Sequence, residues 1–134
     1  MGVGEAMMVA GLGCTQNTRA MAVLATLDAV LEAQGFARDD LAMLATVPAK
    51  KDEPGLVEAA EILGIPLAVP DDTQLKAADS RGLTRSEASL AATGLGSASE
   101  AAALAACGTQ ARLLAPRLVQ DGVTCALAVS GDDE

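Results

Sequence analysis

Short apolar runs alternate with longer segments of helical spacing, and this alternation narrows what the chain can fold into more than any other feature. The apolar runs lie at 7–12, 41–47 and 65–69. The helical segments lie at about 15–34, 54–63 and 70–78. Gly or Pro borders each run, as is typical of buried strands. Strands separated by helices form a parallel sheet through right-handed crossovers, so we predict an α/β domain with helices on both sheet faces, in three α/β/α layers.

The second half of the chain predicts two more helices and then an antiparallel pair of strands. Residues 84–92 have helical composition, and Ser97 with Glu100 fits a capping box that opens an Ala-rich helix. The apolar runs 111–115 and 123–129 flank an Asp-Gly pair, which favours a terminal hairpin. We therefore expect a mixed, mostly parallel sheet that ends in an antiparallel hairpin. The 134 residues suit a single domain, with an ordered core at about 7–129.

Aromatic side chains are almost absent from the sequence. The chain has no Trp, no Tyr and one Phe, Phe36, whereas hydrophobic residues make up 51% of it. The interior must therefore be built from Ala, Leu, Val and Met. A planar ligand would find almost no aromatic ring to stack on.

The charge balance limits the classes of partner. With 18 acidic and 9 basic residues the net charge is −9, which argues against nucleic acid and disfavours an anionic membrane. A small anionic ligand is still compatible, because a local group of donors can outweigh the global charge. The sequence shows no signal peptide and no apolar run of transmembrane length, so we expect a cytoplasmic protein with reduced thiols.

The residue types also limit the chemistry. Without any histidine, Ser–His and Cys–His nucleophilic dyads are excluded. The three cysteines, Cys14, Cys107 and Cys125, are widely separated and do not predict a zinc site. We expect no metal and no bound cofactor, and no catalytic residue is assigned.

The first candidate loop joins the first strand to the first helix. It carries Gly11, Gly13, Cys14, Thr15 and Thr18. Glycines at a strand end let a ligand approach the backbone, and the helix start offers free N–H groups to an anion. The motif is neither a P-loop nor a complete GxGxxG, and a plain tight turn with Thr15 as the N-cap explains it more simply.

A second loop is a candidate binding site for the same reasons. It contains Thr46, Lys50, Asp52 and Glu53, and it lies between a strand end and the helix that begins at Pro54. Since ligands bind at the carboxyl ends of strands in open α/β sheets, it should share a rim with the first loop. An ordinary charged loop is an equally good interpretation.

The third loop contains Thr93, Gly94, Ser97 and Glu100 at another helix start. Its hydroxyls and amides suit a carboxylate or a phosphate, although a well-formed helix cap explains the same pattern.

Four ordered motifs run through these loops and the final hairpin. They are Gly11-Leu12-Gly13-Cys14-Thr15, then Thr46 with Lys50 and Asp52-Glu53-Pro54-Gly55-Leu56, then Thr93-Gly94 with Ser97 and Glu100-Ala101-Ala102-Ala103, and finally Pro116-Arg117 with Gly122-Val123-Thr124-Cys125-Ala126-Leu127-Ala128. In this order they resemble the CobE family and the C-terminal domain of CbiG, proteins of cobalamin biosynthesis. The chain departs at Pro48, Gly96 and Ala98, and Arg117 stands where the family usually has Lys.

The resemblance implies a role on the corrin-ring intermediates of cobalamin biosynthesis. One form of that role is a carrier or accessory factor that binds a precorrin through helix N-termini and basic residues, among them Lys50 and Arg117. The alternative is a CbiG-like cobalt-precorrin-5A hydrolase, or a subunit of one, which opens a lactone and releases acetaldehyde. A further candidate partner is another enzyme of the pathway. An anion-sensing module unrelated to cobalamin would rest on the predicted fold alone.

Overall fold

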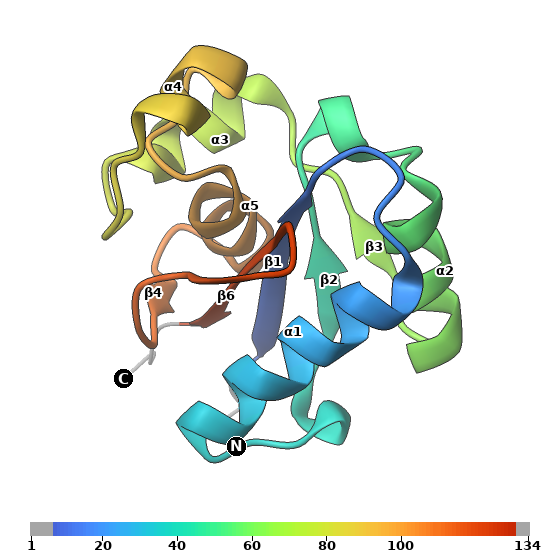
Figure 1. Ribbon diagram of the computed structural model, residues 1–134. Helices are drawn as coiled ribbons and strands as arrows, with labels where there is room; N and C mark the ends of the chain where they lie inside the picture. The colour runs from blue at the N-terminus through green and yellow to red at the C-terminus, as the bar shows by residue number, and fades with distance from the viewer. Residues whose placement is uncertain (1–6, 131–134) are drawn as a thin grey trace, which may run out of the picture.

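A six-stranded mixed sheet forms the centre of the computed structural model, which describes residues 7–130 (Figure 1). The strands are β1 (Met8–Cys14), β2 (Met43–Ala45), β3 (Leu67–Ala68), β4 (Arg112–Leu113), β5 (Leu118–Gln120) and β6 (Val123–Val129). Their order is β3-β2-β1-β6-β4, and β5 also pairs with β6. β1, β2 and β3 are parallel, and β6 is antiparallel to β1, β4 and β5. In the described part of the chain only β6 therefore opposes the other strands. The predicted mixed sheet is confirmed, with two parallel and three antiparallel strand pairs among these residues.

Helices cover both faces of this sheet. They are α1 (Ala20–Gln34), α2 (Pro54–Leu63), α3 (Asp72–Asp79), α4 (Glu87–Thr93) and α5 (Ala98–Cys107), with 3-10 turns at Arg38–Asp40 and Pro48–Lys50. Figure 1 shows α1 and α2 on one side of the sheet and α3, α4 and α5 on the other. The predicted three-layer α/β/α arrangement is confirmed.

The alternation of side chains along β1 divides the core into two parts. Leu12 packs in the apolar cluster of α1 and α2, and Val9 packs in that of α3 and α5. Both clusters consist of Ala, Leu, Val and a few sulfur-containing side chains, whereas Phe36 is 37% exposed. The interior is therefore aliphatic, as the composition predicts.

The structure corrects the predicted N-cap in the first loop, because α1 begins later than expected. Thr15 was expected to be the N-cap, but the helix begins at Ala20, and its N-cap, Arg19, makes no side-chain capping bond. Residues 15–18 form a turn instead, in which the Thr18 N–H donates to the Thr15 carbonyl over 3.3 Å. The Thr15 N–H donates to the Gly122 carbonyl at 3.0 Å. This contact with a distant turn holds the loop away from helical geometry.

Only one of the two hydrogen bonds of the predicted capping box at α5 is present. Ser97 is the N-cap, and its hydroxyl accepts a bond from the Glu100 N–H at 3.3 Å. The Glu100 carboxylate does not return to the Ser97 backbone. It bonds to other segments of the chain, described below.

The expected antiparallel pairing of the 111–115 segment with β6 is present, but an additional strand, β5, lies between them in the chain. The predicted strand 111–115 is reduced to β4 (Arg112–Leu113), and β5 closes the hairpin with β6. Asp121 and Gly122 form its turn, with φ of 51° and 77°. The Leu114 N–H still donates to the Leu127 carbonyl of β6 at 3.0 Å, and the chain then bends before β5, where Pro116 has no N–H to donate to a ladder.

No single helix among residues 7–130 has the length and apolarity to cross a membrane, and α4 with α5 meets that test only as a pair bent by 65°.

Candidate functional site at the carboxyl end of the sheet

The three predicted loops lie at one end of the sheet. The loops after β1 and β2 leave the carboxyl ends of parallel strands, and the Ser99 carbonyl at the start of α5 lies over Gly11 in the middle of β1. Leu95, just before α5, shares an apolar cluster with Val47, just after β2. Figure 1 shows the β1–α1 loop and the loop before α2 at the same end of the molecule as α4. The predicted shared rim is therefore present.

The first two loops meet in a polar group that we call the Lys50 cluster, formed by Cys14, Asn17, Thr18, Lys50 and Glu53. The Asn17 N–H donates to Glu53 Oε2 at 2.9 Å, and Lys50 Nζ lies 4.0 Å from Glu53 Oε1. The Glu53 side chain is only 10% exposed, and that of Lys50 is 28% exposed. A single carboxylate thus joins the two loops, and a half-buried cation lies beside it.

The thiol of Cys14 belongs to this cluster. Burial raises its pKa above the ordinary value of 9.0, and the negative charge of Glu53 raises it further. The positive charge of Lys50 and a hydrogen bond with Thr18 act in the opposite direction. The net result is a neutral thiol at pH 7, which disfavours thiolate chemistry at this position.

A hollow of about 430 Å³ lies between the starts of α1 and α2. It is lined by residues 17–21 and by Glu53, Pro54, Gly55 and Glu58. Neither helix has a side-chain cap, so N–H groups at the start of α1 are available to a ligand. The start of α2 offers only the Gly55 N–H, because Pro54 has none and the Leu56 N–H donates to the Glu53 carbonyl at 3.0 Å. The two starts touch, because a Cβ added at Gly55 would lie 2.1 Å from the Thr18 carbonyl oxygen.

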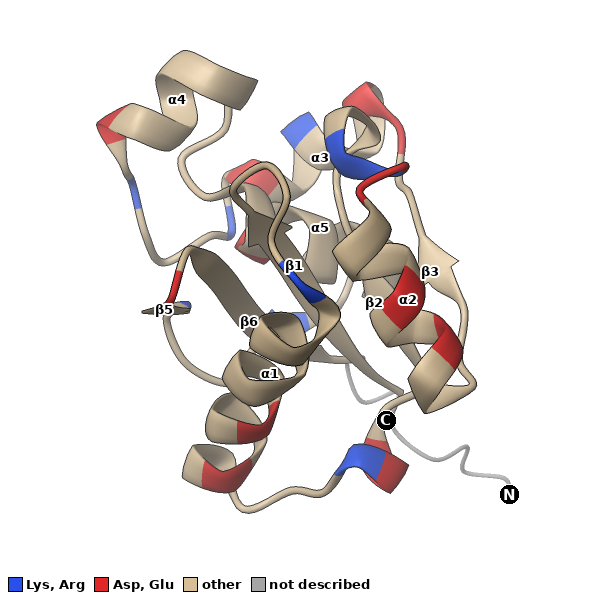
Figure 2. Cartoon of the chain, turned by 45° about the vertical axis from the view of Figure 1, so that its right-hand side comes forward, with Lys and Arg blue, Asp and Glu red and all other residues tan. Residues whose placement is uncertain are grey.

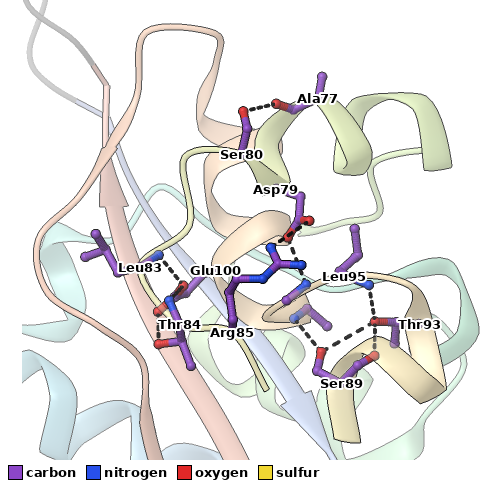
Figure 3. Close-up of polar contacts among 12 residues, drawn as sticks. Ala77, Asp79, Ser80, Leu83, Thr84, Arg85, Ser89, Thr93, Leu95 and Glu100 are labelled. Atoms are coloured by element: carbon purple, nitrogen blue, oxygen red, sulfur yellow. Dashed lines mark hydrogen bonds and ion pairs between the residues drawn. The ribbon is translucent and has the colours of Figure 1, made fainter. Parts of the chain in front are cut away.

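Residues of the third loop form a separate structural group around α4 and α5 (Figure 3). Thr93 Oγ1 donates to the Ser89 carbonyl at 2.7 Å and accepts from the Leu95 N–H at 3.1 Å. Gly94 ends α4 with φ of 78°. These contacts are those of helix caps, in agreement with the simpler interpretation of this loop.

Glu100 is fully buried at the start of α5 and accepts four hydrogen bonds. Its Oε1 accepts from the N–H groups of Leu83 and Thr84, both at 2.8 Å (Figure 3). Its Oε2 accepts from Thr84 Oγ1 at 2.7 Å and from the Arg117 N–H at 2.9 Å. The carboxylate therefore fixes Arg117, which is half-buried, near the start of α5.

Other predicted residues lie beneath the rim or outside these groups. Gly11 and Thr46 are buried, and Thr46 Oγ1 donates to the Leu12 carbonyl at 2.8 Å. Asp52 is exposed. Within residues 7–130 no three Cys, Asp or Glu side chains are grouped closely enough to hold a metal ion.

Sequence reasoning missed Asn17, whose N–H joins the two loops. Its φ of 65° places it in the left-handed region, which Asn tolerates better than most residues. An Asn shortly after the glycines was the available signal.

Known proteins match this chain over nearly its whole length. The family described as "Cobalamin synthesis G C-terminus" matches residues 8–128. Protein CobE of a Sinorhizobium species is 37% identical over 121 residues, which cover 90% of this chain and 79% of that protein. The chain belongs to the CobE and CbiG C-terminal family.

Solved structures of this family have the same fold. A crystal structure of CobE, from the cobalamin biosynthetic pathway, matches with a TM-score of 0.89, 32% identity, and coverage of 96% of this chain and 94% of that one. The cobalamin biosynthesis protein chiG of Agrobacterium tumefaciens gives a TM-score of 0.75 at 44% identity, covering 94% of this chain and 100% of that one. A cobalamin biosynthesis protein G homologue of Sulfolobus solfataricus shares the fold, with a TM-score of 0.67 at 15% identity over 92% of this chain and 36% of its own.

The four CobE-family motifs map onto the rim and its neighbouring strand. The glycine motif ends β1, the Asp-Glu-Pro-Gly-Leu motif opens α2, and the third runs from the end of α4 into α5. The fourth comprises Pro116-Arg117, just before β5, and most of β6, which pairs with β1 along its whole length. Acidic residues are spread along α1 and α2, and the loop before α2 carries two basic residues followed by two acidic ones (Figure 2).

Proposed function

We propose that this cobalamin biosynthesis protein binds a corrin-ring intermediate at the carboxyl end of its sheet, as a carrier or accessory factor. Such an intermediate has an apolar macrocycle with acetate and propionate carboxylates around it. The observation that carries the proposal is the hollow between two helix starts without side-chain caps, together with Lys50, whose Nζ lies 4.0 Å from Glu53 at the edge of that hollow. In a chain of net charge −9, this arrangement supplies donors and positive charge where an anionic ligand needs them.

The other candidate residues have distinct parts in this proposal. Thr15, Thr18 and Glu53 shape the loops next to Lys50, and Arg117 supplies a second cation near the start of α5. Aliphatic side chains cover the macrocycle, because the chain offers no Trp or Tyr. The raised pKa of Cys14 favours binding over thiolate catalysis in this protein.

A corrinoid titration tests the proposal. Purified protein is added to hydrogenobyrinic acid and to an early precorrin while the visible absorbance of the ligand is followed. We expect saturable one-to-one binding that weakens as salt is added. Lys50→Ala should weaken binding about tenfold, or about 1.4 kcal/mol, through the loss of one charge-assisted contact.

Lys51→Ala is the matched control, because Lys51 is the adjacent lysine and is exposed. Equal affinities of the two variants would remove Lys50 from the site, and no binding of any intermediate would overturn the proposal. Release of acetaldehyde from a lactone-containing intermediate would identify the protein as a hydrolase instead.

A further inference from the structure

Helix α5 covers only part of the sheet face on which it packs. A Cβ added at Gly11 would lie 1.9 Å from the Ser99 carbonyl oxygen and 2.8 Å from the Ala103 Cβ, so α5 rests directly on this position. Gly13 is two residues further along β1 and faces the same side. A Cβ added there would meet only the Thr124 hydroxyl, at 2.8 Å, within 4 Å. The cover that α5 provides therefore ends between Gly11 and Gly13.

The uncovered part of the face extends across three strands. Gly13 pairs with Thr124 of β6, and Thr124 pairs with Val119 of β5. Residues that pair directly across a sheet project from the same face, so these three form one row, which we call the Gly13 strip. Val119 is 60% exposed, and Gly13 and Thr124 are partly exposed. The strip is thus an accessible piece of sheet that is shallow at Gly13.

The side of the strip nearest α5 combines an apolar side chain with a cation. Leu83 is 58% exposed, and its N–H bonds to the same Glu100 carboxylate as the N–H of Arg117. Arg117 lies two residues before Val119 in the chain. The Arg117 guanidinium makes no ion pair with any carboxylate of residues 7–130, although acidic residues outnumber basic ones two to one.

We propose that the macrocycle of the corrin-ring intermediate lies on the Gly13 strip, with one of its carboxylates against Arg117. This inference rests on the proposed function and adds to it the face of the sheet that receives the ring. An apolar ring requires an aliphatic surface in a protein without Trp or Tyr, and the exposed side chains of Val119 and Leu83 provide one beside the Thr124 hydroxyl, which lies over Gly13. The free cation matches the carboxylates at the periphery of the ring.

The size of the strip favours this ligand over a second copy of the chain. A stable protein interface buries about 800 Å² on each partner and involves about 20–30 residues a side. The strip with Leu83 and Arg117 comprises far fewer residues.

The absence of Trp and Tyr allows a direct test, because one introduced Trp dominates the fluorescence. Val119→Trp places the reporter on the strip. Ile62→Trp, at a position that is 54% exposed on α2, places it in the opposite layer. Hydrogenobyrinic acid is titrated into both variants, and ligand absorbance confirms saturation in each. We expect stronger quenching of the Trp at position 119, because energy transfer to the macrocycle falls steeply with distance.

Val119→Ser and Ile62→Ser provide a second readout without a bulky reporter. Val119→Ser should weaken corrinoid binding about fivefold through lost apolar contact, and Ile62→Ser should leave it unchanged. Equal or stronger quenching at position 62, or an unaltered affinity of Val119→Ser, would overturn the placement of the ring on the Gly13 strip. Binding of the ligand by the wild-type protein would in that case still support the proposed function.

Two other outcomes separate the remaining cases. Failure of the wild-type protein to bind any corrinoid would overturn the proposed function, and the strip with it. A dimer in size-exclusion chromatography that Val119→Ser abolishes, without preferential quenching at position 119, would assign the strip to self-association.

Discussion

Glu100 is the one charged residue among the buried side chains of the described chain. Burying a carboxylate costs several kcal/mol unless hydrogen bonds replace its hydration. The two oxygens of Glu100 accept four bonds, which fill the acceptor capacity of a carboxylate. Three of the four donors are backbone N–H groups, and no described cation forms an ion pair with it. The residue therefore joins α5 to the segments on either side of it.

Replacing Glu100 with glutamine, the matching amide, tests whether the hydrogen bonds of the carboxylate stabilise the fold. In Glu100→Gln an NH₂ group replaces one of the two carboxylate oxygens, each of which accepts two hydrogen bonds. The NH₂ group cannot accept a hydrogen bond from the N–H groups that it faces. We expect the free energy of unfolding to fall by about 3 kcal/mol, because buried N–H groups lose their partner. Urea unfolding followed by circular dichroism measures the loss. Glu61→Gln, an exposed position, should change the free energy by less than about 0.5 kcal/mol. Similar values for the two variants would contradict the account.

The sequence identified part of this arrangement. The Ser-x-x-Glu pattern correctly placed Ser97 and Glu100 in the first turn of α5, since that pattern is local. It assigned the carboxylate to the wrong partner. The true donors lie 16 and 17 residues away in the chain, beyond the reach of a capping pattern. The contact of Asn17 with Glu53 escaped prediction for the same reason.

Close packing of helices on glycine determines several element positions. Gly11 was predicted to let a ligand approach the backbone, and in the structure α5 occupies that space. Gly55 has a similar role, since it lets the start of α2 reach the turn before α1. A glycine in the sequence signals a close approach but does not identify the atom that approaches.

Alanine substitutions at two neighbouring glycines separate packing from backbone effects. Gly11→Ala should lower the free energy of unfolding by about 3 kcal/mol or more, because the new Cβ overlaps the Ser99 carbonyl on α5. Gly13→Ala meets only the movable Thr124 hydroxyl, so its cost should be smaller. Thermal unfolding by circular dichroism compares them, and loss of a cooperative transition in Gly11→Ala counts as the larger effect. Equal losses would show that α5 does not depend on this contact.

Element boundaries were predictable where local chemistry sets them. Gly35 and Gly64 end α1 and α2 in the left-handed conformation, and Pro54 begins α2, as the sequence indicates. The start of α1 was misplaced because Thr15 bonds to Gly122 of the distant hairpin turn. The three-residue strand β5 carries too short a pattern to be recognised from sequence alone.

At the scale of the molecule, β6 lies between β1 and β4, so one of the last segments of the chain occupies the middle of the sheet. The sequence predicted a buried final strand paired with the 111–115 segment, as β4 is, but not its pairing with β1, because periodicity reports burial and not pairing. It did predict that the first two loops share a rim, since parallel strands end at one edge. Which side chains meet at that rim depends on packing between distant segments.

The central place of β6 buries Cys125 completely between Leu12 of β1 and Leu118 of β5. Burial raises the pKa of this thiol from its ordinary value of 9.0 to about 12. At a pH between these two pKa values, the Cys125 thiol loses its proton in the unfolded chain but keeps it in the folded protein. The unfolded state then binds fewer protons, so the free energy of unfolding is unaffected below about pH 9 and falls as the pH rises toward 12, by up to about 4 kcal/mol.

Cys125→Ala removes this group and should make the alkaline decline in stability less steep than in the wild-type protein. Urea unfolding followed by circular dichroism at pH values from about 8 to about 11 measures the two slopes, with reductant present throughout. Cys107→Ala is the matched control, because Cys107 has a pKa raised less far, to about 11, and should contribute a smaller part of the slope. Parallel curves for the wild-type protein and Cys125→Ala would show that the thiol of Cys125 ionises as readily in the folded sheet as in the unfolded chain, and that β6 is open to water.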